Sequence, residues 1–399
     1  MRGRVLAVDR SVSPPIVIVR GEHMDVRIQT SESWRPGDLV DAGTIVRAFG
    51  VRTAGDFPAP HHETARLPRE RMTNLHARAR ALASLRSFFA SRDFIEVETP
   101  LLVPSPGLEI HLDAVPAGDG FLITSPEYQM KRLLAAGFER IYQVCKCFRG
   151  NERGPHHAGE FTMVEWYRAY AELDAIIADT EQLVAHVVRA VSGGVIVARP
   201  AARTVTIGDG NIDVTPPWPR MTVRDAMRRF ARVEVHGDEP AHELRATVRA
   251  AGIEVGDDAA WDDAFFAAFL ARVEPSIAKR DRPLILHDWP TPLAALARRR
   301  TDDPHTALRF EAYVGGLELA NAFGELTDPV EQRARFEDDL RIRGERGRAT
   351  YPIDNKLLAA LEEGLPPSAG IALGFDRLVM LATGAGEIRD VLAFTADEL

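Results

Sequence analysis

The sequence predicts an α+β protein in which a small β domain precedes a larger domain. Short apolar segments separated by turn residues fill residues 1–55, a pattern typical of a small barrel. Farther along, the apolar spacing predicts a long helix at about residues 71–91 and two strands, 140–145 and 160–167, joined by a polar loop. A chain of 399 residues is long enough for one large and one small domain.

Each part of this organisation has its own signal. The four strand candidates of the first domain are residues 5–8, 16–19, 25–28 and 39–46, and proline-containing turns at 13–15 and 35–38 follow the first and the third. Residues 56–70 contain several prolines and a histidine pair and are interpreted as a linker, which leaves 71–399 as the larger domain. Within it, a mostly helical stretch is interrupted at about residues 195–220, which we expect to be a surface insertion.

Composition excludes some classes of protein. The net charge of −9 argues against a broad nucleic-acid-binding surface, which usually needs a basic face. No run of eighteen apolar residues is present, so no membrane span is expected. Cys145 and Cys147 stand two apart on a predicted strand and are expected to point to opposite faces, without a disulfide. Two free thiols are typical of the reducing cytoplasm.

The loop between the two central strands is the first candidate for chemistry. Arg149 follows the apolar strand and opens this loop, and Phe161 lies at the start of the second strand. A guanidinium can bind a phosphate through its planar fork, and an aromatic ring offers a flat apolar face to a base. This segment therefore indicates a site for a nucleoside triphosphate.

Two later segments carry further candidates. Glu311, Glu318 and Glu325 recur at spacings of seven among apolar residues, and half-buried carboxylates need cations or hydrogen-bond donors. Mg²⁺ bound to ATP is one such cation and a substrate ammonium is another, whereas a strand with ordinary surface acids is the alternative. Near the C-terminus, a strand of small residues at 368–374 would let a nucleotide approach the backbone, and Arg377 then starts an apolar helix.

In this order, the three segments resemble motif 2, the acidic strand and motif 3 of class II aminoacyl-tRNA synthetases, and most closely the lysyl group. The helix at 71–91 and the strand ending at Pro100 resemble motif 1. The resemblance covers roughly residues 72–399 and implies an antiparallel sheet flanked by helices, ATP and Mg²⁺ as cofactors, and a homodimer. Within the lysyl group, four segments are similar to a shortened paralogue that attaches β-lysine to elongation factor P: residues 125–134, 165–168, 318–321 and 351–354.

The resemblance also implies roles for individual residues. Arg149 and Arg377 would be catalytic, on the α- and γ-phosphates respectively, and Glu311 and Glu318 would bind Mg²⁺. The residues that would contact ATP are Arg149, Asn151, Glu152, His157, Phe161, Glu311 and Arg377. The residues that would contact the amino acid are Glu127, Glu165, Tyr167, Asn321, Phe323, Glu325 and Ala372.

Three questions stay open in the sequence. The Arg-x-Glu pattern of the lysyl group reads Arg149-Gly150-Asn151-Glu152, so the adenine contact falls on Asn151 or Glu152. Ala372 stands where a tRNA-charging enzyme has glycine, and one methyl, worth about 1–3 kcal/mol in a pocket, would favour β-lysine over α-lysine. The role of residues 1–55 is also open.

The expected activity is an AMP-forming ligase with elongation factor P, not tRNA, as the acceptor. Residues 1–55 are fewer than the anticodon-binding domain of the lysyl group and lack an evident aromatic platform for bases. A lysyl-tRNA synthetase is the first alternative. A non-catalytic amino-acid-binding regulator is the second, although such a protein would be expected to lose the phosphate arginines or the magnesium acids.

Overall fold

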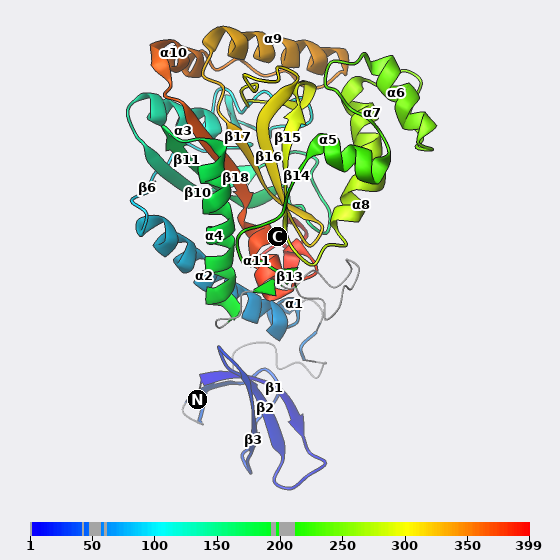
Figure 1. The fold of residues 1–399 in the computed structure, drawn as a ribbon. Coiled ribbons are helices and arrows are strands. Elements are labelled where there is room, and N and C mark those ends of the chain that lie inside the picture. Colours follow the sequence, from blue (N-terminus) through cyan, green and yellow to red (C-terminus); the bar gives the residue numbers. More distant parts are fainter. Residues whose placement is uncertain (1, 42–43, 48–56, 60–61, 193–196, 199–211) are drawn as a thin grey trace. The chain divides into compact units, whose positions relative to one another are not determined.

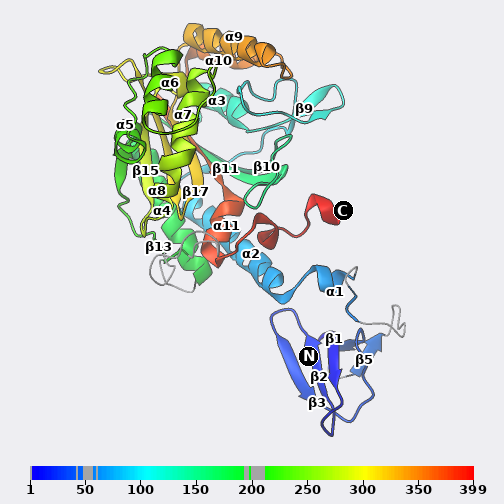
Figure 2. The same ribbon diagram turned by 90° about the vertical axis from the view of Figure 1, so that its right-hand side faces the viewer.

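The computed structural model describes residues 2–41, 44–47, 57–59, 62–192, 197–198 and 212–399. The chain divides into two compact units, Met1–His76 and Ala77–Leu399, and each is described by itself (Figures 1 and 2). The boundary lies inside one helix, α2 (Arg69–Ala90), which corresponds to the helix predicted at 71–91. None of the helices in the described ranges combines the length and hydropathy that a membrane-spanning segment needs.

The N-terminal unit is an antiparallel sheet of five strands in the order β3-β2-β1-β4-β5. The strands are β1 (Arg2–Asp9), β2 (Ile16–Arg20), β3 (Asp25–Gln29), β4 (Leu39–Asp41) and β5 (Thr44–Arg47). Its small core includes Val5, Val17, Val19 and Trp34. A closed barrel would require β3 to pair with β5, and in the described part of the chain both remain edge strands. The expected barrel is therefore an open sheet there.

The segment predicted as a linker is partly helical. It contains α1 (Glu63–Arg66), and α2 already begins at Arg69. Residues 48–56 and 60–61 lie outside the described residues, so the expected boundary at residue 55 has no structural counterpart to compare with.

The larger unit is built on an eight-stranded sheet in the order β14-β15-β16-β17-β18-β11-β10-β6. The strands are β6 (Ile95–Glu96), β10 (Arg140–Phe148), β11 (Glu160–Ala169), β14 (Arg220–Thr222), β15 (Leu284–Pro290), β16 (Thr306–Val314), β17 (Leu317–Gly324) and β18 (Ser368–Gly374). The six central strands pair antiparallel, and only β14 and β6 at the edges pair parallel to their neighbours. This confirms the predicted α+β fold with an antiparallel sheet.

One face of this sheet is covered by helices α2, α4 (Leu173–Ser192) and α11 (Phe375–Thr383). The largest core of the protein lies there, with Trp166 of β11 and Phe88 and Phe89 of α2 fully buried. Leu85 is also buried, as the helical spacing predicts. Because alternate residues of a strand point to opposite faces, the other side chains of β11, β17 and β18 are left for the second face.

Further helices surround the rest of the sheet. On the second face, α3 (Glu127–Ala135), α9 (Pro329–Glu345) and α10 (Asn355–Gly364) form a second core together with Ile141 and Tyr167. At the β14 and β15 edge, a third core includes residues of α5 (Val223–Ala226), α6 (Ala241–Ala250), α7 (Trp261–Ala268) and α8 (Glu274–Ile277). Two small sheets complete the unit: β7 (Leu102–Val103) with β8 (Pro116–Ala117) and β9 (Gly120–Leu122), and β12 (Val197–Ala198) with β13 (Ile212–Asp213).

The structure differs from two expectations. Of the interruption at 195–220, residues 195–196 and 199–211 lie outside the described residues, but Val214 and Trp218 are buried in the main core. The Trp218 ring N–H donates to the Val214 carbonyl at 2.9 Å, so this part is not a surface insertion. Cys145 and Cys147 do not point to opposite faces: their Sγ atoms lie 3.9 Å apart, because residues two apart on a strand share a face. Both thiols are free.

Candidate active site

Two neighbouring rows of side chains cross the second face of the sheet. Residues that pair directly across antiparallel strands point to the same side, and rows two residues apart lie next to each other. The first row runs over β11, β18, β17 and β16 through Glu165, Ala372, Asn321 and Glu311. The second row runs over the same strands through Tyr167, Gly370, Phe323 and Arg309. Strand register thus gathers residues that are far apart in the sequence.

A cavity of about 290 Å³ lies over these rows. Most of the residues predicted from the sequence line it: Glu127, Arg149, Glu152, His157, Phe161, Glu165, Tyr167, Glu318, Asn321, Phe323, Glu325, Ala372 and Arg377. Two do not. Asn151 is exposed in the loop after β10, whereas its neighbour Glu152 faces the cavity. Glu311 is buried in β16 and does not line the cavity wall.

At one end of the cavity, Glu165 is a buried acid held by two hydroxyl groups. Ser125 donates to its Oε1 at 2.6 Å, and the Tyr167 hydroxyl donates to its Oε2 at 2.9 Å. Burial, together with the nearby charge of Glu127, raises the pKa of Glu165 well above its usual range. An ammonium group in the cavity would favour the ionised form and lower this pKa.

Lys131 joins the two other acids at this end. Its Nζ lies 2.5 Å from Glu127 Oε1 and 2.7 Å from Glu325 Oε2, and the side chain is almost fully buried. Burial opposes the charged form, but the two carboxylates raise the pKa of Lys131, so it stays an ammonium. If Glu127, Glu165 and Glu325 are all ionised, their three negative charges exceed the single positive charge of Lys131 by two. The sequence analysis did not identify Lys131, although its spacing of four from Glu127 on one helix was a signal.

Glu325 keeps an acceptor free for a ligand. Its Oε1 is buried and accepts no hydrogen bond from any described residue. Burial raises the pKa of this carboxyl above its usual value, with Lys131 opposing the rise. A buried carboxylate oxygen without a donor is costly, and a substrate ammonium would supply the missing donor.

Gly370 allows these groups to approach one another. A Cβ at this position would lie 2.2 Å from two ring carbons of Tyr167 and 2.6 Å from Glu325 Oε1, far inside contact distance. The small-residue strand predicted near the C-terminus therefore makes room for Tyr167 and Glu325, in addition to any approach by a nucleotide.

At the other end of the cavity, Arg149 lies beside Phe161. Its guanidinium carbon is 5.1 Å from the centre of the Phe161 ring, and its Nη1 is 3.5 Å from Glu152 Oε1. The Nε of Arg149 is buried and has no hydrogen-bond partner among the described residues. The unpaired buried N–H of this Arg can donate to a phosphate, and the adjacent aromatic face can stack on the base that is attached to it.

Arg377 faces the same end from the first turn of α11. Its guanidinium donates to the Glu318 carbonyl at 2.5 Å and lies 2.7 Å from His157 Nε2. Burial and the charge of Arg377 lower the pKa of His157, so this ring is neutral at pH 7 and can accept the hydrogen bond. Asp376 fixes the start of the helix, because it pairs with Arg78 at 2.5 Å and accepts from the Thr162 amide at 2.7 Å.

The pair predicted to hold Mg²⁺ is only partly open to the cavity. Glu318 lines the wall, while Glu311 accepts hydrogen bonds of 2.6 Å from Arg309 and from Tyr313. Burial and the charge of Glu318 raise the pKa of Glu311 to about 7. Each oxygen of Glu311 retains a lone pair, and two such acids with phosphate oxygens suit Mg²⁺. The residues therefore fit the ion.

Two further residues were missed. Arg309 donates from Nε to Asn321 Oδ1 at 3.1 Å and so orients that amide in the floor of the cavity. Glu109, an exposed residue, lines the cavity, and loss of hydration from the surrounding protein raises the pKa of its carboxyl. It lies in the loop between β7 and β8, where no periodic pattern distinguishes a functional acid from a surface acid.

The chain is similar to known proteins over most of its length. A family model described as tRNA synthetases class II (D, K and N) matches residues 62–398. An elongation factor P–(R)-β-lysine ligase of Klebsiella pneumoniae (strain 342) is 39% identical over 341 residues, which cover 83% of this chain and 97% of that protein. A lysine–tRNA ligase of Dehalococcoides mccartyi (strain 195) is 37% identical over 326 residues, covering 80% of this chain. The match spans 63% of the length of that ligase.

Proposed function

The chain belongs to the class II tRNA synthetases of the D, K and N group, and on that premise we propose that it activates lysine or (R)-β-lysine with ATP and transfers it to a lysine side chain of elongation factor P. The observation that carries the proposal is the cluster of acids around buried Lys131, in the same cavity as Arg149 and Arg377. One end suits a dicationic amino acid and the other suits ATP.

The charges of the substrate complement those of the cluster. Lysine and β-lysine each carry two ammonium groups, and a buried ammonium needs charged hydrogen-bond partners. We assign the distal ammonium to Glu165 and Glu325, with Tyr167 beside them, and the amino group near the carboxylate to Glu127. Phe323 and Ala372 would contact the carbon chain between the two ends, since both lie in the floor.

The first chemical step would form an aminoacyl adenylate. A carboxylate oxygen of the amino acid attacks the α-phosphorus of ATP, a new P–O bond forms, and the bond to the departing pyrophosphate breaks. In this proposal Arg149 stabilises charge on the α-phosphate, Arg377 holds the γ-phosphate, and Phe161 stacks on adenine. Mg²⁺ held by Glu318 and Glu311 would neutralise phosphate charge. Catalysis then rests on positioning and charge stabilisation, without a nucleophilic side chain.

In the second step the neutral amine of the acceptor attacks the activated carbonyl carbon. The C–N bond forms, the C–O bond to the adenylate breaks, AMP leaves with the electron pair, and the nitrogen loses its extra proton to solvent. Elongation factor P is proposed as acceptor because the match accounts for 97% of the length of relatives named as its β-lysine ligases. Ala372 supports β-lysine as the amino acid. Its methyl, which would favour β-lysine over α-lysine, lies between Glu165 and Asn321 in the cavity floor.

A lysyl-tRNA ligase is the second candidate, because relatives of that name are similarly identical to this chain. An acceptor assay separates the two: ATP, Mg²⁺ and labelled α- or β-lysine are supplied with either lysine tRNA or purified elongation factor P. We expect label on the factor and none on tRNA. Label on tRNA alone would overturn the proposed acceptor, and absence of lysine-dependent pyrophosphate exchange would overturn the proposed activation step and favour a non-catalytic regulator.

We also propose that the enzyme acts as a homodimer in the cytoplasm. Two apolar side chains are exposed, Ile95 of edge strand β6 at 52% and Leu102 of β7 at 50%, which suits a surface that a second copy covers. Free Cys145 and Cys147 fit a reducing compartment. Analytical ultracentrifugation should give twice the chain mass, and Ile95→Arg should shift it to the monomer. A monomeric wild-type protein would contradict the dimer.

A further inference from the structure

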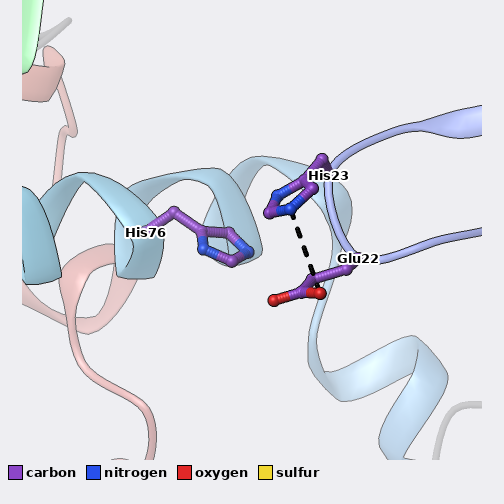
Figure 3. A group of neighbouring side chains, drawn as sticks. All are labelled: Glu22, His23 and His76. Atoms are coloured by element: carbon purple, nitrogen blue, oxygen red, sulfur yellow. Dashed lines mark ion pairs between the residues drawn. The ribbon is translucent and has the colours of Figure 1, made fainter.

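The N-terminal unit contains a cluster of two imidazoles and one carboxylate: Glu22, His23 and His76 (Figure 3). One possible ligand atom from each lies within 4.8 Å of the other two. His23 Nε2 is 3.9 Å from Glu22 Oε2, and the two imidazole rings have centroids 5.1 Å apart. Within the described part of the chain, no other group of three His, Cys, Asp or Glu side chains meets that distance.

The backbone brings these residues together independently of their side chains. Glu22 and His23 are the central residues of the turn between β2 and β3, which the Gly21 amide closes by donating to the Met24 carbonyl at 3.0 Å. His76 comes from α2. Arg69 and His76 are seven residues apart, so they lie on the same face of that helix, two turns from each other.

Arg69 fastens the turn to this face of α2. Its guanidinium donates to the carbonyls of Gly21, at 2.7 Å, and Glu22, at 3.0 Å, and it pairs with Asp25 at 2.5 Å. The backbone that carries Glu22 and His23 is therefore held against the helix that carries His76, which is the preorganisation that a metal site needs.

We propose that Glu22, His23 and His76 bind a divalent transition metal ion, preferentially Zn²⁺, which links the β2–β3 turn to α2. Two imidazole nitrogens and one carboxylate oxygen are a donor set for Zn²⁺, whereas Mg²⁺ and Ca²⁺ take oxygen ligands. Bonds of about 2.0–2.2 Å in a tetrahedral site place ligand atoms roughly 3.4 Å apart. Glu22 and His23 are exposed and His76 is half-buried, so rotation, above all of the first two side chains, can close the remaining gap, and water would complete the coordination.

This site would be distinct from the proposed active site, whose residues all belong to the other unit. Its role would be structural. A metal that binds the folded N-terminal unit and not the unfolded chain stabilises that unit by mass action.

The test is a calorimetric titration of the full chain with Zn²⁺, after removal of any affinity tag and bound metal. We expect one ion per chain. His23→Ala and His76→Ala should each weaken binding by at least about tenfold, since even changes to residues behind the ligands cost that much. The matched control is His242→Ala, because His242 also neighbours an acid, with Nε2 4.0 Å from Glu243, but has no third ligand among the described residues.

Two further measurements make the outcome decisive. Circular dichroism should show that both ligand variants remain folded, and their lysine-dependent pyrophosphate exchange should equal that of the wild type. Lowering the pH should weaken binding, because protonated imidazole is no ligand. The proposal is overturned if the wild type binds no stoichiometric Zn²⁺, or if His76→Ala binds it as tightly as the wild type.

Discussion

Replacing Gly370 by alanine is expected to impair recognition of the amino acid while leaving ATP binding intact. The added Cβ would lie 2.2 Å from Cδ1 and Cε1 of Tyr167, whereas ordinary contact begins at 3.4 Å, so the ring must retreat by the difference, 1.2 Å. Tyr167 is buried and its hydroxyl donates to Glu165 at 2.9 Å. A retreat of that size takes the hydroxyl out of hydrogen-bond range and leaves Glu165 without one of its two donors.

The size of the effect follows from that hydrogen bond. A hydrogen bond to a charged group contributes about 1.5–3 kcal/mol, and about 1.4 kcal/mol corresponds to a factor of ten. The KM for lysine should therefore rise roughly ten- to hundredfold. The crowded core should also lose about 1–3 kcal/mol of stability, which thermal unfolding would measure.

The assay is lysine-dependent exchange of pyrophosphate into ATP, with KM measured for both substrates. Gly374→Ala on the same strand is the matched control, because its Cβ would meet the Arg377 side chain at 3.5 Å, an ordinary contact. This control should keep the wild-type KM for lysine. A wild-type KM for lysine in Gly370→Ala, or an equal rise in Gly374→Ala, would refute the account of the cavity floor.

Three other predictions concern the charges in the cavity. Lysine binding needs ionised Glu165, whose pKa is raised. The KM for lysine should therefore fall as pH rises through that pKa. Glu165→Gln should abolish this pH dependence in the same assay. Glu109→Gln should raise the KM for lysine less than Glu165→Gln does. The reason is that the Glu109 carboxylate is open to the cavity but does not hold the distal ammonium. Equal increases in KM would contradict this ranking. Lys131→Met leaves Glu127 and Glu325 without their cation, so the pKa of Glu325, which Lys131 lowers, should rise and the pH profile of lysine KM should move to higher pH. An unmoved profile would show that Lys131 does not set the charge of Glu325.

The sequence was sufficient where the signal is local. The two-residue period of β11 already places Phe161 and Glu165 on one face, and the apolar helix after Arg377 is visible in its spacing. Register between distant strands is not local. That Gly370 lies opposite both Tyr167 and Phe323 depends on how β18 pairs with β11 and β17, and no single segment encodes that pairing.

The same limit explains the residues that sequence reasoning missed or misplaced. Trp218 was assigned to a surface insertion because turn residues surround it, yet tertiary packing buries it in the main core. Lys131 resembles any cation on a helix surface until the fold brings Glu325 to within 2.7 Å of it. Lys131 and Glu127 form an ordinary i,i+4 pair that becomes part of the site only because it is buried. Burial depends on the fold of the whole chain and cannot be read from the helix alone.

Lys131 also changes how the cavity would discriminate among amino acids. Assigning Glu165 and Glu325 to the distal ammonium and Glu127 to the other one suggests separate contacts for two ammonium groups. In the structure, Lys131 bridges Glu127 and Glu325, so the acids form one cluster whose total charge must be compensated. An amino acid with a single ammonium would leave one buried negative charge unpaired, which costs several kcal/mol or forces uptake of a proton. The cluster would therefore select total charge, and the length of the carbon chain over Ala372 would then discriminate between dications.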